Sequence, residues 1–559
     1  QQLKQSADTP EPPKEDVSDW LQELLQYADG ASLYSKSAPT VIRKTVRLPE
    51  TQDGEPICQS WRQMVNIGYA HDGLIGSVQE QLRRAQKEIG FTYLRFHGIF
   101  DDDMHIYQEN EDGSPWFNFA YADLLFDFIQ EIGLIPYVEL GYMPSKLAKT
   151  QYTVFDNPAI CISMYNDSEK WQALVQACLS HWIDKYGLAN VRKWRFTVFS
   201  MNYSRLQYTA PVMSHEDYCK MFEATYQTIK MIDPELKLGG AGCFPGIALA
   251  PDGLRRFLLD VKEHGCPPDF ITVQCYPHED FSQDSDFFYF TSKQTSMPSV
   301  LSKDKNFTLH FLQWLNRIRQ EIGFADCPVV VEEWNSTLWQ RDLSGDTCYK
   351  AAWLIKNVLQ NYDQAEYLGY WLLTDFLDEW LVPGGVFHGG YGLFTINGIP
   401  KAGYQALRML GRIGERKIAS GEGWFVSRTE NTIQVYLYHY CHYDALYRYR
   451  YQKLTDPHDA YKVFEVDGRL KIELELCGLD PGVYRQESWT LNRSAGSAFD
   501  KWLEMEAPRV MTPEDLNYLN DMAQPLCKIR DADTAGALHL QTELEPHEVR
   551  LIVLKKRDG

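Results

Sequence analysis

Several features that would define a function directly are missing from this chain of 559 residues. It has no run of about 18 apolar residues, which excludes a membrane-spanning helix and gives no reason to expect a membrane partner. Its 12 cysteines form no Cys-x-x-Cys pair and no Cys/His cluster with zinc spacing, so we expect no metal ion and no other cofactor. No Ser-His-Asp arrangement stands out, and no Gly-rich phosphate loop follows the first predicted strand.

Excess positive charge is also missing. The 55 Lys and Arg residues face 76 Asp and Glu residues, which gives a net charge of −21. A surface this acidic repels phosphate, so the chain by itself is not expected to bind DNA or RNA. Aromatic residues, by contrast, make up 13% of the chain, with 33 Tyr and 15 Trp. This abundance suits the stacking of sugar rings as well as it suits a large aromatic core.

The cysteines are scattered between Cys58 and Cys527, which is typical of free thiols in a reducing compartment. We therefore expect a cytoplasmic protein. The first residue is Gln1 and no signal peptide precedes it, so we expect the chain to be either a processed form or a piece cut from a longer protein.

Residues 61–413 repeat one pattern, in which an apolar, β-branched or aromatic run is followed by an amphipathic helix. Eight such pairs predict a (β/α)₈ TIM barrel of the α/β class. An open doubly wound sheet would also alternate, but it usually carries the Gly-rich loop that is absent here. The strands are expected at 64–70, 91–99, 134–140, 194–200, 236–242, 269–276, 328–334 and 368–374. The helices are expected near 77–89, 120–132, 168–186, 214–232, 250–264, 309–322, 346–361 and 401–413.

The regions on either side of this repeat differ from it. Residues 1–18 are polar and Pro-rich and predict a linker. Residues 19–60 contain a short amphipathic helix and an alternating strand at 41–49, and we expect them to pack on the C-terminal region. Residues 414–559 consist of short alternating runs separated by turn residues, one of them at 447–454, and predict a β-sandwich domain.

Polar and aromatic residues occupy the C-terminal ends of the predicted barrel strands, where barrels of this kind carry their functional groups. Such a set suits a carbohydrate. The candidates for substrate contact are His97, Gln274, Tyr276, Trp334, Asn335 and Trp371, and the ends of two further strands hold Arg95 and Glu139.

Glu333 is the strongest single position, because it closes the apolar strand PVVVEEW. A carboxylate there can serve as a glycosidase nucleophile. The less favoured alternative is a strand-end glutamate paired with an arginine. Side chains alternate along a strand, so only one of Glu332 and Glu333 is expected to face the barrel interior.

Five segments in series carry a resemblance to a known family: RFHGIFDDDM, PYVELGYMPSKLA, DFITVQCYP, VVVEEWNST and FHGGYGLF. Over roughly residues 60–415 the chain resembles glycoside hydrolase family 39, the β-xylosidase family. The resemblance implies a retaining mechanism on a (β/α)₈ barrel and a pentose or pentosyl oligosaccharide as ligand. It places Glu333 at the position of the nucleophile and matches His97 to a sugar-contacting histidine.

The chain departs from this family where the general acid/base belongs. The fourth strand of the family ends in Trp-Asn-Glu-Pro, and the corresponding segment here reads WRFTVFSMNYS, so that Met201 occupies the acid/base position. No Asp or Glu occurs between Asp184 and Glu216, so no local shift of the alignment restores a carboxylate. The family's His-x-Tyr-Pro after the sixth strand is Gln-Cys-Tyr-Pro here, beginning at Gln274.

Three functions fit these residues. The first is a catalytically impaired family member that binds a sugar without efficient turnover. Similar barrels follow AraC-type helix-turn-helix modules in some bacterial regulators, so the chain could be a sugar sensor that reaches DNA only through an upstream domain. The second is an active retaining β-xylosidase or β-glycosidase with a relocated acid, for which Asp375, Asp378 and Glu379 are nearest in sequence. The third is a structural or assembly role with a relict cleft. A homo-oligomer is compatible with each.

Overall fold

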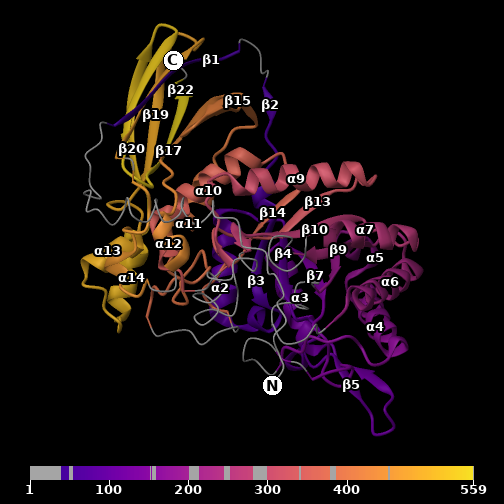
Figure 1. The fold of residues 1–559 in the computed structure, drawn as a ribbon. Helices are drawn as coiled ribbons and strands as arrows, with labels where there is room; N and C mark the ends of the chain where they lie inside the picture. Colours follow the sequence, from indigo (N-terminus) through magenta and orange to yellow (C-terminus); the bar gives the residue numbers. More distant parts are fainter. Residues whose placement is uncertain are drawn as a thin grey trace, which may run out of the picture.

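The eight barrel strands follow one another around a closed cylinder, as the computed structural model shows (Figure 1). The structure describes residues 39–49, 54–151, 153, 159–199, 213–243, 252–280, 299–338, 341–377, 385–450, 454–466 and 468–557. Met201, Asp378 and Glu379 therefore lie outside the described residues, as do the predicted linker and the predicted helix before residue 39.

Each barrel strand pairs in parallel with the next one in the chain, and β14 closes the cylinder against β3. The strands are β3 (Met64–Tyr69), β4 (Tyr93–His97), β7 (Ile135–Leu140), β8 (Arg195–Val198), β9 (Lys237–Cys243), β10 (Phe270–Cys275), β13 (Val329–Trp334) and β14 (Tyr367–Tyr370). The helices that follow them are α2 (Gly76–Glu88), α3 (Ala120–Glu131), α4 (Ser168–Tyr186), α6 (His215–Ile232), α7 (Asp252–Glu263), α9 (Phe307–Glu321), α10 (Cys348–Asn361) and α11 (Ala402–Leu410). The predicted (β/α)₈ barrel is confirmed.

Two short hairpins and one short helix lie in the loops of the barrel. They are the hairpin β5 (Tyr107–Glu109) with β6 (Pro115–Phe117), the short helix α5 (Leu188–Val191) and the hairpin β11 (His278–Asp280) with β12 (Ser299–Leu301).

One end of the barrel is closed by a layer of large side chains. These are Met64, Tyr93, Tyr137, Phe270, Val330 and Tyr367, each from a different strand and each buried. Most lie near the N-terminal ends of their strands. The Tyr93 and Tyr367 rings, for example, lie 5.3 Å apart. This layer, called the aromatic floor below, fills the N-terminal half of the cylinder. Polar side chains that point inward at the opposite, C-terminal end therefore pack against it.

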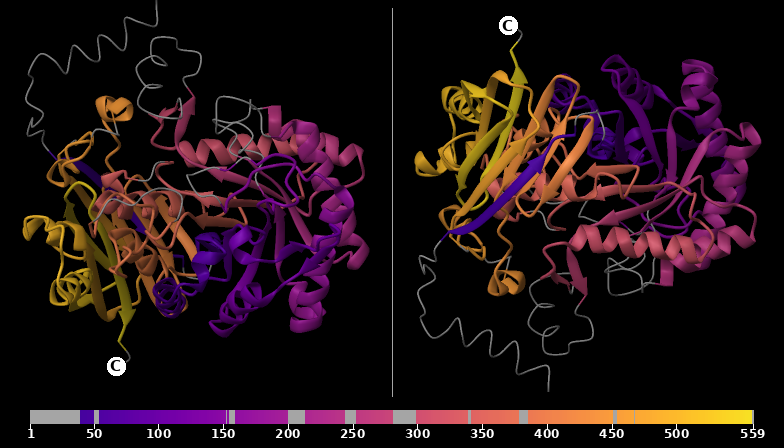
Figure 2. Two further views of the ribbon diagram at one scale, coloured as in Figure 1. Left: turned by 90° about the horizontal axis from the view of Figure 1, so that it is seen from below. Right: turned by 90° about the horizontal axis from the view of Figure 1, so that it is seen from above.

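A C-terminal sheet domain lies beside the barrel (Figures 1 and 2). Its larger sheet has the order β2 (Glu55–Pro56), β15 (Arg416–Gly421), β16 (Trp424–Arg428), β17 (Thr432–Tyr438), β22 (Val549–Lys556), β19 (Gly482–Leu491) and β20 (Leu526–Thr534). Its smaller sheet has the order β1 (Thr40–Arg47), β18 (Leu470–Cys477) and β21 (Ala537–Leu544). Alternate residues of β18 are buried, and Leu474 packs in one apolar cluster with Val435 and Leu554 of the facing sheet. The two sheets thus form a sandwich.

The segment predicted as a strand at 447–454 begins instead in the short helix α12 (Ala445–Arg450). Its alternating Tyr and Arg residues imitate a strand pattern, but tertiary contacts decide the conformation. The Tyr447 hydroxyl donates to Asp342 over 2.7 Å, and Arg448 Nε donates to the Leu301 carbonyl over 2.6 Å. Both partners belong to barrel loops, so α12 joins the two domains.

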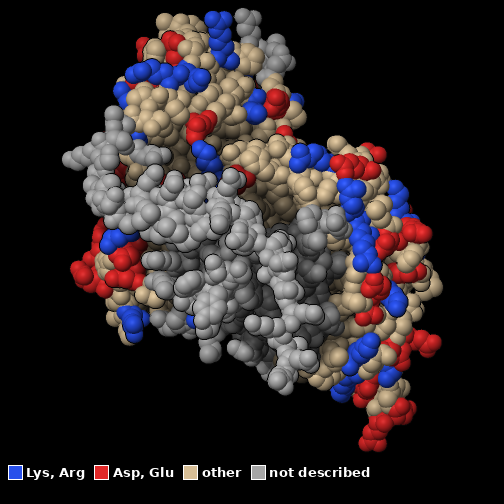
Figure 3. All heavy atoms as spheres, viewed as in Figure 1, with Lys and Arg blue, Asp and Glu red and all other residues tan. Residues whose placement is uncertain are grey.

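Two more helices, α13 (Ala498–Glu504) and α14 (Pro513–Met522), pack against the loop after β14 through Phe499 and Phe387. In the described part of the chain, no helix has both the length and the apolar character needed to cross a membrane. On the face shown in Figure 3, Lys and Arg are interspersed with Asp and Glu over the described surface.

Candidate active site

The two glutamates at the end of β13 both point into the barrel, which corrects the expectation that only one does. A β-bulge is the reason. Val331 pairs with Val273 of β10, whereas Glu333 pairs with the very next residue, Gln274, so Glu332 is an extra residue in the ladder. The bulge cancels the alternation at this point. Arg95 therefore contacts both carboxylates, at 2.9 Å for Glu333 and 3.6 Å for Glu332.

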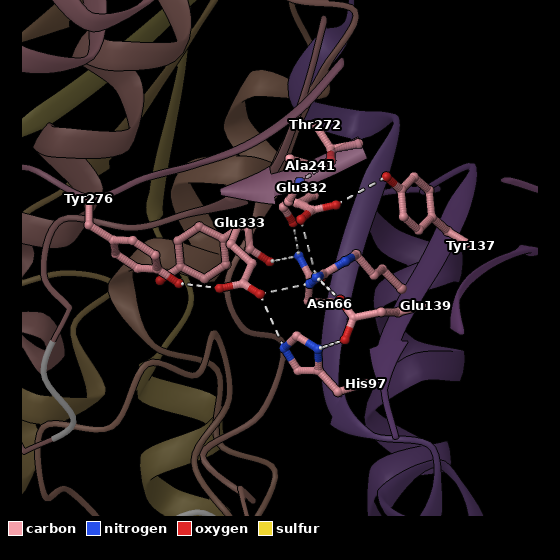
Figure 4. Close-up of polar contacts among 12 residues, drawn as sticks. Asn66, His97, Tyr137, Glu139, Ala241, Thr272, Tyr276, Glu332 and Glu333 are labelled. Atoms are coloured by element: carbon pink, nitrogen blue, oxygen red, sulfur yellow. Dashed lines mark hydrogen bonds and ion pairs between the residues drawn. The ribbon is translucent and has the colours of Figure 1, made fainter. Parts of the chain in front are cut away.

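Glu333 is the point where three hydrogen-bond donors meet (Figure 4). Its Oε1 atom lies 2.9 Å from Arg95 Nη1 and 3.1 Å from His97 Nε2. Its Oε2 atom accepts a hydrogen bond of 2.9 Å from the Tyr276 hydroxyl. Arg95 and His97 are two residues apart on β4 and so share its inner face, while Tyr276 follows β10 directly.

Glu139, at the end of β7, holds the two cationic side chains in place. Its Oε2 atom accepts from Arg95 Nη2 over 2.6 Å, and its Oε1 atom lies 2.7 Å from His97 Nδ1. Asn66 of β3 accepts from Arg95 Nη1 over 3.1 Å and donates to the carbonyls of Glu332 and Tyr370. The side chains of Arg95 and His97 thus bridge Glu139 and Glu333.

The charges of this cluster fix Glu333 as an anion. Burial by itself would raise the pKa of Glu333, but the Arg95 charge and the His97 hydrogen bond outweigh burial and lower it to about 2. Burial likewise opposes a charge on His97, yet the Glu139 carboxylate raises the pKa of His97 to about 10. At neutral pH an imidazolium and a guanidinium therefore face Glu333.

Glu332 behaves differently, because it lies deeper in the barrel. Its Oε2 atom accepts a hydrogen bond of 3.3 Å from the Tyr137 hydroxyl, and Tyr137 belongs to the aromatic floor. Burial raises the pKa of Glu332 to about 7, although the Arg95 charge opposes this shift. This carboxyl therefore titrates near neutral pH.

Replacing Glu332 with Gln is expected to make the protein more stable at pH 8 and to change little at pH 4.5. The folded protein keeps the Glu332 proton up to a pKa of about 7, whereas the unfolded chain loses it near 4.5. Wild-type stability therefore falls as the pH rises through this interval, by on the order of 3 kcal/mol. Denaturant unfolding between pH 4.5 and 8.5 measures the difference. The exposed Glu131→Gln on α3 is the matched control, and an identical gain from Glu332→Gln at both ends of the range would contradict this account.

Three aromatic rings lie near the imidazole of His97. The Trp371 ring lies 5.0 Å from the imidazole, the Tyr142 ring 5.8 Å and the Tyr69 ring 5.9 Å. Of these, Trp371 is one of the residues expected from the sequence, whereas Tyr69 and Tyr142 were not. Both belong to apolar runs at strand ends, and that was the only signal for them. Gln274 lies next to Glu333 through the β10–β13 pairing and is nearly buried.

Two expected contact residues do not reach the barrel interior. Trp334 points outward, with its ring 4.4 Å from that of Trp353 on α10 and its Nε1 atom donating to Thr308 of α9. The Trp334 ring therefore lies between the barrel wall and the helices rather than beside Glu333. The side chain of Asn335 is fully buried and donates to the Trp371 carbonyl, while Lys350 of α10 donates to its Oδ1 atom. Asn335 therefore positions Trp371.

Asp375, the described member of the three candidates for a relocated acid, is committed to an ion pair. Its Oδ2 atom lies 2.6 Å from Lys401 Nζ, and its Oδ1 atom accepts from the Gly392 amide over 2.8 Å. Lys401 also pairs with Asp346 at 2.5 Å. This buried network holds the loop after β14 in place and engages both oxygens of the Asp375 carboxylate.

A closed (β/α)₈ barrel with an anionic glutamate at the end of its seventh strand is an architecture of glycosidases. The sequence model of the family Glycosyl hydrolases family 39 matches residues 44–539, and the chain belongs to that family. It is 26% identical over 517 residues to a Beta-xylosidase of Geobacillus stearothermophilus, covering 92% of this chain and 96% of that protein. It is 33% identical over 362 residues to a Beta-xylosidase of Caldicellulosiruptor saccharolyticus, covering 64% and 69%.

The fold is likewise that of a monomeric beta-xylosidase from Caulobacter crescentus CB15. The TM-score is 0.79 at 22% identity, over 93% of this chain and 100% of that one. A weaker similarity links the chain to an uncharacterized HTH-type transcriptional regulator of Staphylococcus aureus. It is 22% identical over 233 residues, which is 41% of this chain and 29% of the regulator.

Proposed function

We propose that the barrel mouth binds a pentose or pentosyl oligosaccharide and cleaves it poorly. The observation that carries this proposal is the Glu333 carboxylate, which is held as an anion by Arg95, His97 and Tyr276. Two relatives that match the chain well are β-xylosidases, which supports a pentose-containing ligand. The rings of Trp371 and Tyr142 beside His97 suit a sugar face.

Retaining hydrolysis needs a second carboxyl group about 5–5.5 Å from the nucleophile to protonate the leaving oxygen. Among the described residues, Glu139 and Glu332 are the other carboxylates of the cluster. Glu139 is bonded to both Arg95 and His97, and Glu332 lies beneath Arg95 against Tyr137. The chain from residue 185 to 215 contains no Asp or Glu. These observations favour binding over turnover.

The anionic state of Glu333 gives it a clear role in binding. A carboxylate accepts hydrogen bonds from sugar hydroxyls, and bonds to charged groups are the strong ones. We further propose that the bound sugar is a signal and that the chain is the sensing part of a regulator. The partial similarity to a helix-turn-helix regulator supports this step.

Calorimetric titration with xylose, arabinose and xylo-oligosaccharides tests the binding step. Three or four polar and stacking contacts, less the costs of association, predict a Kd between about 1 mM and 1 μM. Glu333→Gln removes the charge and is expected to weaken binding by about 10–100-fold. Glu131→Gln, on the exposed face of α3, is the matched control and should bind as the wild type does.

The result that would overturn the proposal is the absence of heat with every sugar at millimolar concentration, from protein with an unchanged melting temperature. That outcome would leave a structural role for the barrel. Binding that Glu333→Gln leaves unchanged would place the sugar elsewhere.

A further inference from the structure

Two neighbouring helices in the outer layer of the barrel bring an imidazole, a thiol and a carboxylate together. His215 and Cys219 are one turn apart on α6, and Asp260 comes from α7. His215 Nε2 lies 2.7 Å from Asp260 Oδ2 and 3.5 Å from Cys219 Sγ. The three donor atoms all lie within 4.8 Å of one another.

The arrangement is not that of a hydrolytic triad. In such a triad the base contacts its nucleophile through one ring nitrogen and its orienting carboxylate through the other. Here the thiol and the carboxylate both face the same nitrogen, Nε2 of His215. A proton on Nε2 can satisfy only one of them well, whereas a metal ion bound to Nε2 would be shared by all three side chains.

We propose that His215, Cys219 and Asp260 bind one Zn²⁺ ion, with water as the fourth ligand. Imidazole, thiolate and carboxylate are the three protein ligand types of zinc, and tetrahedral coordination with bond lengths of about 2.0–2.3 Å spaces the donor atoms roughly 3.3–3.7 Å apart. The observed spacings straddle these values, so small side-chain rotations suffice. The Asp260 side chain is 36% exposed and that of His215 14%, which gives the ion and its water access.

Binding balances as a proton exchange. The Cys219 thiol releases its proton to solvent and the thiolate sulfur forms the Zn–S bond, while His215 binds as the neutral imidazole through Nε2. The ion also replaces the His215–Asp260 hydrogen bond. Arg256 competes for the carboxylate, because its Nε atom lies 3.7 Å from Asp260 Oδ2. Removing Arg256 should therefore strengthen metal binding.

The same pair of helices provides a control site. His264, which follows α7, lies 3.6 Å from Glu223 of α6 and has a side chain that is 52% exposed. It is thus another histidine–carboxylate pair linking α6 to the α7 region.

Titration of the chelator-treated full chain with Co²⁺, a spectroscopic substitute for Zn²⁺, tests the proposal. We expect one equivalent of Co²⁺ to produce a near-ultraviolet thiolate-to-cobalt charge-transfer band and tetrahedral d–d bands, and Zn²⁺ to displace both. Cys219→Ser should abolish the charge-transfer band. His215→Gln should weaken binding by more than about tenfold, and it carries the test if the cysteine variant does not fold. His264→Gln should change nothing, and Arg256→Gln should tighten binding severalfold.

Two results would overturn the proposal. One is the absence of any charge-transfer band with Co²⁺ up to millimolar concentration. The other is a band that survives in Cys219→Ser or that is weakened as much by His264→Gln as by His215→Gln, since the metal would then bind through other side chains.

Discussion

Arg95→Met is expected to lower the free energy of unfolding by about 3–5 kcal/mol at pH 7, one of the largest losses that a single substitution can cause in this chain. The Arg95 side chain is completely buried and contacts Glu139 at 2.6 Å and Glu333 at 2.9 Å. Methionine fills a similar volume but leaves these carboxylates without their main counter-charge. The loss should shrink toward pH 4–5, because the freed carboxylates can then be protonated.

Arg195→Met is the matched control. Arg195 belongs to the neighbouring part of the barrel, on β8, but its guanidinium donates only to the backbone carbonyls of Lys193 and Trp194, each at 3.3 Å. The effect there should stay below about 1 kcal/mol. Denaturant midpoints and melting temperatures measure both variants. Equal losses from the two substitutions would contradict the central electrostatic role assigned to Arg95.

The second large effect concerns the leaving group of the substrate. The proposed lack of a general acid predicts that cleavage of an alkyl or sugar leaving group is slower by about 10²–10⁴-fold, whereas an activated aryl xyloside needs little protonation. We expect slow release of an activated phenol by Glu333 at neutral pH and almost no hydrolysis of xylobiose.

Met201→Glu is expected to raise xylobiose hydrolysis, because it introduces a carboxyl group at the position that the sequence resemblance predicts for the family's acid. Met201→Gln has the same size but cannot act as the acid, so it is the matched control and should gain nothing. Glu333→Gln should abolish what activity there is. Hydrolysis of xylobiose by the wild type at an ordinary glycosidase rate, about 1–10³ s⁻¹, would refute the hypothesis that catalysis is impaired. The acid would then lie elsewhere, and Asp378 and Glu379 are the next candidates.

The barrel could be predicted closely because its strands are buried on both faces. The expected strand 328–334 differs from β13 (Val329–Trp334) by one residue, and the expected helix 168–186 coincides with α4. Continuous apolar runs followed by amphipathic helices leave little ambiguity. The C-terminal domain was harder. The edge strand β20 (Leu526–Thr534) is charged and mostly exposed, so it shows no alternation, and it was missed.

The position of Glu333 could be predicted, but its immediate surroundings could not. Glu332 and Glu333 both point into the barrel because of a bulge in the pairing of β13 with β10. The register of that pairing cannot be predicted from the local sequence of either strand. Trp334 was assigned to the site because of its residue type, although side chains alternate again after the bulge and the one that follows Glu333 points toward the helices. Asn335 donates to the Trp371 carbonyl and accepts from Lys350, and these contacts form only when the chain has folded.

The pairing of β1 with β18 sets an order of events during synthesis. Arg43 bonds to Glu473 and Thr45 to Glu475, in each case across 430 residues of chain. At 5–20 residues per second, β1 waits roughly 20–90 s after leaving the ribosome before its partner is made. The whole barrel is translated during that interval. The first described strand is therefore among the last to find its place, and until then its unpaired backbone is a surface for chaperones to cover.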